Sequence, residues 1–468
     1  MSVFEHKQFY RNISWLSLTE LCFKLLSFVF FIAFTRTLGE QGLGEYTYLF
    51  SVLSLVMLSW DLGVSTYYQR LWASEPAGFN RDIRNLLGTR LALIAVSLAV
   101  FVPYVLVYDR ALAWPFVVVI LICVCDAVRA LPVIYLQSQN NFRANFIINV
   151  LDRIIGYGGA IVVLILHGSL LGVLLALLAG RFVSMVVAHV FQGYLYMPTF
   201  SFAVARRIVL SALPLFFMAL FSSIYFRVDS IMIRHLLEFE ALGFYSAAYK
   251  LLDITTVLTA IFSAASFPIL ISLLKSGAAE LRAFLSQHAL YLCIVGVFVA
   301  CELFLYAPHI LDLLYGPRFA VSSSLILRYL APSLICIFLN SIAVQYLVAA
   351  RQEGFVLKVF MSLTVLNILL NFWLIPRYDI VGAAVSTFVC ELANTSLLYW
   401  RMPVRLKLGD LGALAAITAV CVFATWALPL PWLVRAVLGG LLYVGAGLWF
   451  GLIKVSDLRL LARVKASG

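Results

Sequence analysis

Charged side chains that interrupt long apolar stretches are the residues of this chain that could do chemistry. Lys24, Asp61, Arg227 and Lys250 each fall near the middle of a stretch long enough to cross a bilayer. A charge at the bilayer centre costs roughly 2.5–3.5 kcal/mol, so such a residue is the best indication of function. A buried cation can bind an anionic group, and a buried carboxylate can bind and release a cation. The pattern indicates a polar cavity inside a transporter.

Some of these cations have a carboxylate on the same helix face. The pairs, three or four residues apart, are Glu20 with Lys24, Asp126 with Arg129, and Lys250 with Asp253. We interpret them as intramembrane charge pairs, which serve either the structure or a binding site.

Arg227 has only Asp229 nearby in sequence, two residues on and therefore on another helix face. Its partner must lie on a different helix or in the ligand, so Arg227 and Lys24 rank highest as ligand-binding residues. The remaining arginines are expected nearer a membrane boundary, to which their side chains would snorkel; they are Arg129, Arg153 and Arg181.

Carboxylates inside the stretches could couple transport to a cation, either H⁺ or Na⁺. The candidates are Asp61, Glu302 and Glu391. The histidines fall in loops or near the ends of stretches, which argues against a histidine proton relay. Phosphate-binding loops and metal-ligand motifs are absent, so we expect no ATP hydrolysis, no metal and no cofactor. Energy must come from an ion gradient, the membrane potential or the substrate gradient.

The elements that position these charges are membrane helices. With 63% hydrophobic residues, 12% charged residues and a mean hydropathy of +1.02, the chain is expected to be an integral membrane protein. Spans of about 20 residues predict helices, because barrel strands are nearer ten residues. The fold class is therefore an all-α polytopic membrane protein with about fourteen transmembrane helices. The predicted spans are 12–36, 45–69, 86–108, 114–138, 144–166, 170–193, 207–233, 242–272, 285–307, 322–349, 355–376, 380–401, 410–428 and 432–453.

The net charge of +11 reflects topology rather than nucleic-acid binding, because the basic residues are scattered over loops. Placing both termini in the cytoplasm puts most basic residues inside, as the positive-inside rule requires. All eight cysteines lie in predicted spans, where a thiol is a small apolar group, so neither a disulfide framework nor a metal site is expected.

A weak internal repeat divides the chain. Leu43-Gly44-Glu45-Tyr46 at the start of the second span recurs as Leu242-Gly243-Phe244-Tyr245 at the start of the eighth. Six helices separate the copies, as in transporters built from two parallel halves. We therefore predict an N-lobe at residues 1–200 and a C-lobe at 201–405, with six helices each around a central cavity. Residues 406–468 would add an accessory helix pair and a basic cytoplasmic tail.

Two motifs carry a resemblance to a known family: the glycine-rich stretch Thr35–Tyr46 and the stretch Asp379–Thr387. Together with the predicted lobes, they resemble the polysaccharide transporter branch of the multidrug/oligosaccharidyl-lipid/polysaccharide (MOP) exporter superfamily, and within it Wzx-type O-antigen flippases. The resemblance covers the first twelve spans. It implies a non-enzymatic flippase that moves an undecaprenyl-diphosphate-linked oligosaccharide across a bacterial inner membrane by alternating access, for synthesis of O-antigen lipopolysaccharide or another surface polysaccharide. Membrane lipids and the polysaccharide polymerase machinery would be its partners.

A lipid diphosphate suits a cationic cavity. Lys24, Arg227 and Lys250 are then the candidates for the diphosphate. Asn149, Asn367 and Asn371 could contact sugar hydroxyls, although hydrogen bonding between helices accounts for them equally well.

Three other functions remain open. A lipid II flippase would also have fourteen spans and a cationic cavity. A cation-coupled multidrug antiporter fits less well, because intramembrane cations repel cationic drugs. A membrane O-antigen polymerase or glycosyltransferase would usually have a sizeable outside loop with catalytic residues, and the predicted outside loops are short.

Overall fold

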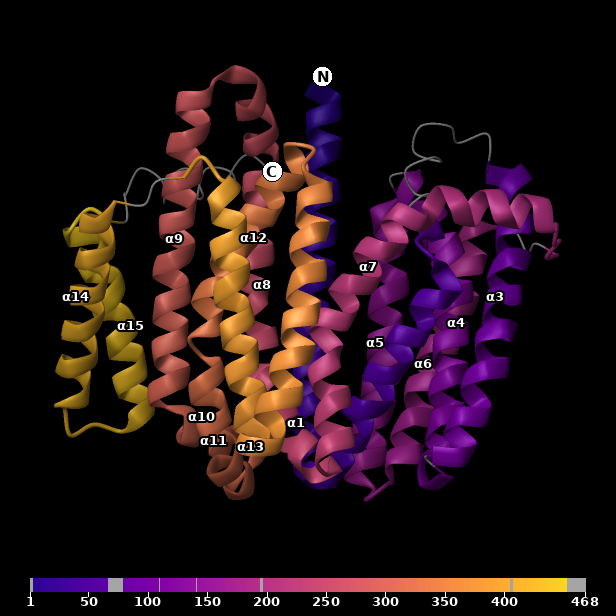
Figure 1. The fold of residues 1–468 in the computed structure, drawn as a ribbon, viewed down its shortest axis with the longest axis horizontal. Helices are drawn as coiled ribbons and strands as arrows, with labels where there is room; N and C mark the ends of the chain where they lie inside the picture. The colour runs from indigo at the N-terminus through magenta and orange to yellow at the C-terminus, as the bar shows by residue number, and fades with distance from the viewer. Residues whose placement is uncertain are drawn as a thin grey trace. The chain divides into compact units, whose positions relative to one another are not determined.

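The computed structural model describes residues 3–65, 79–108, 110–139, 141–193, 197–404 and 407–452. Within these ranges the chain is almost entirely helical and contains no β-strand, so the predicted all-α fold is confirmed (Figure 1). The elements are α1 (Val3–Asp61), α3 (Phe79–Tyr108), the short 3-10 turn η2 (Arg110–Leu112), α4 (Ala113–Ser138), α5 (Phe142–Ile165), α6 (Leu170–Gln192), α7 (Phe202–Leu236), α8 (Phe239–Ser276), α9 (Ala278–Leu305), α10 (Ala307–Tyr315), α11 (Pro317–Leu330), α12 (Ser333–Ala349), α13 (Glu353–Arg401), α14 (Leu408–Trp426) and α15 (Trp432–Trp449).

Many of these helices are long and apolar enough to span a membrane. Over the described ranges nine helices meet this criterion, and a tenth span results if α11 and α12, bent by 45° at their junction, are counted as one. Pro332 lies at that junction, where its missing N–H cannot continue the helical hydrogen bonds. The chain is therefore a multi-span helical membrane protein, whereas the predicted number of fourteen spans stays a prediction.

Two of the helices contain a break between two predicted spans. Gly39 (φ 68°, ψ −165°) interrupts α1, and Asp379 (φ 55°, ψ −148°) interrupts α13. Glycine adopts a positive φ without steric penalty. At Asp379 the side chain supports the unusual backbone, because its Oδ1 accepts a hydrogen bond from the N–H of Ile380 at 2.7 Å. Both motifs that carry the family resemblance thus mark a helix break.

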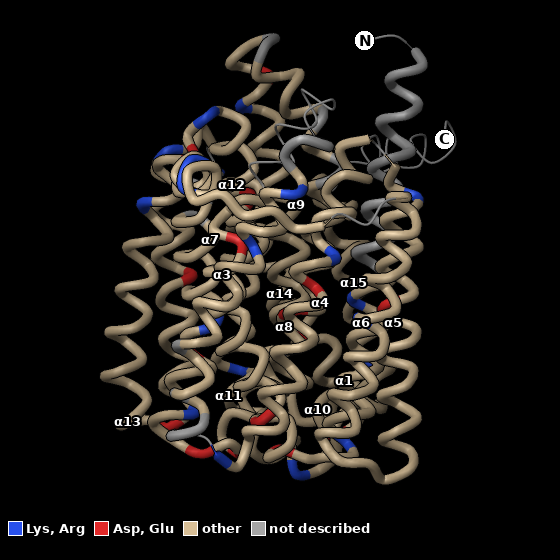
Figure 2. Tube along the Cα trace, turned by 90° about the vertical axis from the view of Figure 1, so that its right-hand side faces the viewer, with Lys and Arg blue, Asp and Glu red and all other residues tan. Residues whose placement is uncertain are grey.

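Charged residues occur at the helix ends and also between them. Figure 2 shows long runs of uncharged chain interrupted by individual Lys, Arg, Asp and Glu positions. For each charged residue away from the helix ends, the side chains that it contacts indicate whether its role is structural or functional.

The chain divides into two compact units, described separately. The N-terminal unit comprises residues 12–246, and the C-terminal unit comprises residues 247–468 together with 1–11. The boundary falls inside α8. The division at residue 200, which follows the internal repeat, stays a prediction.

In the N-terminal unit, α6 packs along both α4 and α5. Leu136, Ala144, Ile148 and Ala188 form a buried cluster between these helices. A second cluster joins the end of α1 to α3, α4 and α7; it consists of Val64, Ile83, Leu86, Leu131, Ile134, Ile208 and Ala212. Dense packing of this kind holds α4, α5 and α6 in a fixed register, which allows their polar side chains to meet.

The repeated motifs pack on each other within the N-terminal unit. A β-carbon at Gly44 would overlap the carbonyl oxygen of Phe239, and one at Gly243 would overlap the carbonyl oxygen of Glu40. Only glycine fits at either position, so each copy of the motif packs against the backbone one helical turn before the other copy.

In the C-terminal unit, α12 packs against α9 and α13, and the hairpin α14–α15 packs against α9. The hydroxyl of Tyr443 donates a hydrogen bond to the carbonyl oxygen of Ile294 at 3.0 Å. Around it lies an apolar cluster formed by Leu290, Cys293, Ile294, Leu414, Ile417, Cys421, Tyr443 and Leu452. The last two helices are therefore attached to α9.

Candidate functional site

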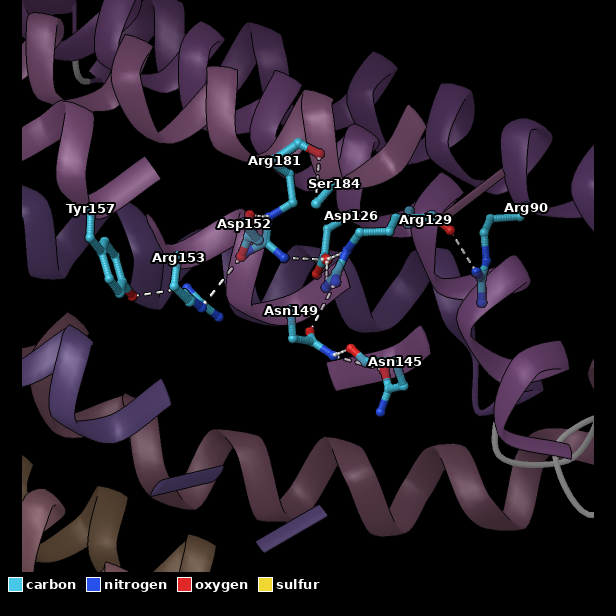
Figure 3. Close-up of polar contacts among 11 residues, drawn as sticks. Arg90, Asp126, Arg129, Asn145, Asn149, Asp152, Arg153, Tyr157, Arg181 and Ser184 are labelled. Carbon is cyan, nitrogen blue, oxygen red and sulfur yellow. Dashed lines mark hydrogen bonds and ion pairs between the residues drawn. The ribbon is translucent and has the colours of Figure 1, made fainter. Parts of the chain in front are cut away.

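A connected set of charged side chains lies where α4, α5 and α6 meet (Figure 3). We call it the arginine–aspartate network; its members are Asp126 and Arg129 of α4, Asp152 and Arg153 of α5, and Arg181 of α6. Oδ1 of Asp126 accepts hydrogen bonds from Nη2 of Arg129 and Nη1 of Arg181, each at 2.7 Å. Asp152 forms ion pairs with Nε of Arg153 at 3.3 Å and with Nε of Arg181 at 3.5 Å. Three arginines therefore share two carboxylates, which leaves one positive charge in excess.

The network continues at one end into two asparagines. Nη1 of Arg129 donates to Oδ1 of Asn149 at 3.0 Å, and Nδ2 of Asn149 donates to the carbonyl oxygen and to Oδ1 of Asn145 at 2.8 Å. Asn149, predicted to contact a sugar, is therefore engaged by neighbouring side chains. Its role toward a ligand stays a prediction.

At the other end the network meets aromatic rings. Nη1 of Arg153 donates to the hydroxyl of Tyr157 at 2.9 Å, and the guanidinium lies 3.9 Å from the centroid of the Phe23 ring of α1. Cations are attracted to the face of an aromatic ring, most strongly where water is excluded. Phe23 immediately precedes Lys24, whose side chain is partly buried and makes contacts of its own. The side chain of Glu20, the predicted partner of Lys24, lies outside the described residues.

Helical periodicity explains how α5 supplies so many members. Asn145, Asn149, Arg153 and Tyr157 follow one another at intervals of four residues, which places them along one face of the helix. On α4, Asp126 and Arg129 are three residues apart, and their predicted pairing is present in the structure. The spacing on each helix therefore builds a polar stripe, and packing of α6 joins the stripes through Arg181.

Arg227 of α7 belongs to the same electrostatic environment. The hydroxyl of Tyr46, in the glycine-rich motif of α1, interacts electrostatically with the guanidinium groups of Arg153, Arg181 and Arg227. The side chain of Arg227 is exposed on the protein surface, in contrast to the network arginines. Among the described residues Arg227 has no ion-pair partner, so it adds a second positive charge near the network, and its exposed donors are accessible.

A separate buried ion pair involves Asp61. Arg90 of α3 is 3% exposed; its Nη2 pairs with the carboxylate of Asp61 and donates to Oγ of Ser65 at 2.5 Å, while Nη1 donates to the carbonyl oxygen of Ala127 at 2.7 Å. Asp61, a candidate for cation coupling, is therefore bound to an arginine that also ties α1 to α4. Its coupling role stays a prediction.

The candidate residues of the C-terminal unit lie in smaller polar groups. Nζ of Lys250 is 3.1 Å from Oδ2 of Asp253, one turn along α8. On α13, Nδ2 of Asn371 donates to Oδ1 of Asn367 at 3.1 Å, and both residues are almost fully buried. The structure thus shows helix-internal partners for these residues and does not test their contact with a ligand.

Glu391 and Glu302 lie in different environments of the C-terminal unit. Glu391 is 5% exposed and accepts a hydrogen bond from Nδ2 of Asn340 at 2.9 Å, across the contact between α13 and α12. Glu302 on α9 is partly buried and faces α15, where its Oε1 lies 3.3 Å from the position that a β-carbon at Gly439 would take. Of the two, Glu391 is the more deeply buried carboxylate. Within the described ranges, no cluster of His, Cys, Asp and Glu could hold a metal ion.

Two features of the site differ from the sequence-based expectation. The arginines expected to snorkel instead point into the helix bundle: Arg129, Arg153 and Arg181 are 12%, 17% and 14% exposed and bind carboxylates. Two charged residues were missed, Arg90 and Asp152. Arg90 lies only four residues inside its predicted span, and Asp152 is adjacent to Arg153, a spacing that gives no same-face pair. Arg90 pairs with Asp61 of α1, and Asp152 reaches Arg181 of α6, and sequence spacing does not reveal such contacts between helices.

Comparisons with known proteins agree with this architecture. Residues 9–274 match the family model described as polysaccharide biosynthesis protein. A relative from Haloferax volcanii, named probable low-salt glycan biosynthesis flippase Agl15, is 22% identical over 80% of this chain and 79% of its own length. Among solved structures, the lipid II flippase MurJ in an inward closed conformation has a TM-score of 0.77 at 13% identity, covering 92% of this chain and 98% of that one. An inward-facing multidrug resistance MATE family transporter of the MOP superfamily has a TM-score of 0.63 at 15% identity, covering 84% and 95%.

These structural likenesses concern the fold, whereas the family match extends over more than half of the sequence. The resemblance to a polysaccharide transporter family inferred from the Thr35–Tyr46 and Asp379–Thr387 motifs is therefore confirmed, and the chain belongs to the polysaccharide biosynthesis protein family.

Proposed function

We propose that this protein is a flippase that moves a lipid-linked oligosaccharide, carried on undecaprenyl diphosphate, from the cytoplasmic to the periplasmic leaflet. The observation that carries the proposal is the excess of arginine over carboxylate among the intramembrane side chains of the N-terminal unit. Arg129, Arg153 and Arg181 share two aspartates, and the exposed Arg227 interacts with the same tyrosine as two of them.

The chemistry of the substrate fits this arrangement. A lipid diphosphate is a compact anion with several acceptor oxygens, and arginine donates two parallel hydrogen bonds to such a group. Desolvation inside a helix bundle strengthens each of these bonds relative to water. Sugar hydroxyls require donors and acceptors, which Asn149, Asn367 and Asn371 would supply if the site rearranges during transport.

Relatives and neighbours support the class of substrate. The curated relative is named as a glycan biosynthesis flippase, and the solved structure with a TM-score of 0.77 is a lipid II flippase. A multidrug antiporter is less compatible, because the positive charge surplus would repel a cationic drug. The name of the curated relative also favours a transporter over a polymerase or glycosyltransferase.

Alternating access would be driven by a cation gradient. Glu391 is the first candidate for the coupling carboxylate because of its burial, with Asp61 and Glu302 as alternatives. We further propose that the protein resides in the bacterial inner membrane with both termini in the cytoplasm. It would deliver lipid-linked oligosaccharide to a polymerase that assembles O-antigen, capsule or exopolysaccharide.

The test is deletion of the coding sequence, followed by analysis of lipid-linked sugars. A flippase of this kind predicts accumulation of an undecaprenyl-linked repeat unit that remains inaccessible to a periplasmic glycan-modifying enzyme, and restoration of access by the wild-type chain. Accumulation of lipid II instead would identify a lipid II flippase. Unchanged lipids combined with new sensitivity to cationic dyes would refute the proposal in favour of a drug antiporter.

A further inference from the structure

The two aspartates of the network are held very differently. Asp126 accepts short, well-directed hydrogen bonds from Arg129 and Arg181. Asp152 is 4% exposed, yet its contacts with Nε of Arg153 and Nε of Arg181 are 3.3 and 3.5 Å long and are not hydrogen bonds. Its Oδ2 and both Nε atoms are buried without a hydrogen-bond partner among the described residues. Asp152 is therefore a counterion for two arginines but a poor acceptor for either.

This arrangement is costly for a purely structural ion pair. A buried donor without an acceptor loses about 1–3 kcal/mol of solvation free energy, and a buried pair is favourable only when its geometry is good. The same two guanidinium groups are otherwise well supported: Arg153 by Tyr157 and the Phe23 ring, and Arg181 by Asp126. Their orientation is thus fixed by other partners, and Asp152 contributes mainly its charge.

A phosphate group would satisfy these donors better than Asp152 does. Its tetrahedral oxygens can accept from Nε of one arginine and Nε of the other, whereas one planar carboxylate approaches both at ion-pair distance only. The network carries one excess positive charge, which an incoming anion would neutralise. A carboxylate that already lies between the two arginines would compete with that anion and promote its release.

We propose that Arg153 and Arg181 form a phosphate-binding subsite for the anionic head group, and that Asp152 is its built-in competitor, which occupies both guanidinium groups whenever the phosphate has left. The subsite rests on the proposed function and adds residues to it: the sequence alone assigned the diphosphate to Lys24, Arg227 and Lys250. The two arginines should strengthen binding of the phosphate and Asp152 should weaken it, so substitutions of the two kinds are expected to change the affinity in opposite directions.

The experiment measures binding of farnesyl diphosphate to the purified full-length chain in lipid nanodiscs. Arg153→Gln and Arg181→Gln are each expected to weaken binding at least tenfold, and Arg153→Lys and Arg181→Lys are expected to retain part of it because they keep the charge. Asp152→Asn is expected to strengthen binding severalfold while slowing turnover of the lipid-linked glycan. The matched control is Arg328→Gln, since Arg328 is exposed on α11 and its Nε donates to the carbonyl oxygen of Phe304.

The sign of the Asp152→Asn effect separates a competitor from a structural ion pair. Weaker binding in Asp152→Asn, together with a lower thermal unfolding temperature, would overturn the proposal, as would wild-type binding in both glutamine variants or no binding by the wild type. None of these results affects the lipid-accumulation test, so the subsite can fail while the flippase function stands.

Discussion

Gly156 of α5 and Gly180 of α6 meet where the two helices cross, so closely that a β-carbon on Gly180 would lie 2.6 Å from the Cα atom of Gly156 and 2.7 Å from the carbonyl oxygen of Asp152. Small residues at such crossings let helix backbones approach each other in membranes. Arg181 follows Gly180 directly, and Asp152 lies one turn before Gly156. The crossing therefore sets the distance between the arginine of α6 and the aspartate of α5.

Gly180→Ala should force α5 and α6 apart, because the new methyl group would meet backbone atoms that cannot rotate away. We expect a loss of about 1–3 kcal/mol in the free energy of unfolding and weaker diphosphate binding, since Arg181 moves away from Arg153. Gly158→Ala is the matched control on α5, where no described atom beyond the neighbouring backbone of the helix itself lies within 4 Å of the added β-carbon. Equal thermal unfolding temperatures for the two variants would contradict the close crossing.

Asp61→Asn and Arg90→Gln should each destabilise the protein, because the first leaves the buried guanidinium of Arg90 and the second leaves the partly exposed carboxylate of Asp61 without its charged partner. The expected cost is toward the low end of about 3–5 kcal/mol, since Asp61 is partly exposed. The double variant should cost less than the sum of the single ones, as measured by thermal unfolding in detergent. Strict additivity would mean that the two residues do not act as a pair.

The single Asp61→Asn variant also tests the coupling role of Asp61. If transport by a folded Asp61→Asn variant keeps its normal dependence on the ion gradient, Asp61 is not the coupling carboxylate.

Arg227→Gln and Lys24→Gln should abolish export of the surface polysaccharide while leaving the protein in the membrane. The reason is that both residues are proposed to bind the anionic head group, and glutamine keeps a polar side chain while removing the charge. Arg377→Gln serves as a control, because Arg377 is exposed and donates to the carbonyl oxygen of Trp373 close to the break of α13 at Asp379. The measurement is surface polysaccharide normalised to protein in the membrane fraction. Normal polysaccharide in both variants would exclude these residues from the site.

Glu391→Gln should uncouple transport from the cation gradient. Glutamine can still accept a hydrogen bond from Asn340, so the fold is preserved, but it cannot bind and release a cation. In proteoliposomes we expect flipping to continue down the substrate gradient and to lose its response to an imposed H⁺ or Na⁺ gradient. Glu302→Gln, tested in parallel, should keep that response. If the two variants exchange their behaviour, the coupling carboxylate is Glu302 instead.

Sequence reasoning predicted the elements of this structure better than the contacts between them. Hydropathy and length identified the apolar helices, and the i, i+3 rule placed Asp126 with Arg129 and Lys250 with Asp253, because both properties depend only on local spacing. Arg90 and Asp152 escaped notice for the opposite reason. The partner of Arg90 is on α1, and the second partner of Asp152 is on α6, and a single sequence does not state which helix faces which.

The same limit explains why the network arginines were misinterpreted. Arg153 and Arg181 look like boundary residues when only depth along the span is counted, since neither has a same-face carboxylate on its own helix. The Gly156 and Gly180 crossing brings Asp152 of α5 within reach of Arg181 of α6. Close glycine pairs between successive spans are therefore the signal that could have predicted the network from sequence.

The contact between the repeated motifs has a symmetry of its own. Gly44 touches Phe239, four residues before Gly243, and Gly243 touches Glu40, four residues before Gly44. The chain thus contains, within one polypeptide, the isologous interface of a homodimer, in which one patch is complementary to a second copy of itself. Because each glycine packs against the backbone of the segment that carries the other, a side chain added at either glycine would push both segments apart.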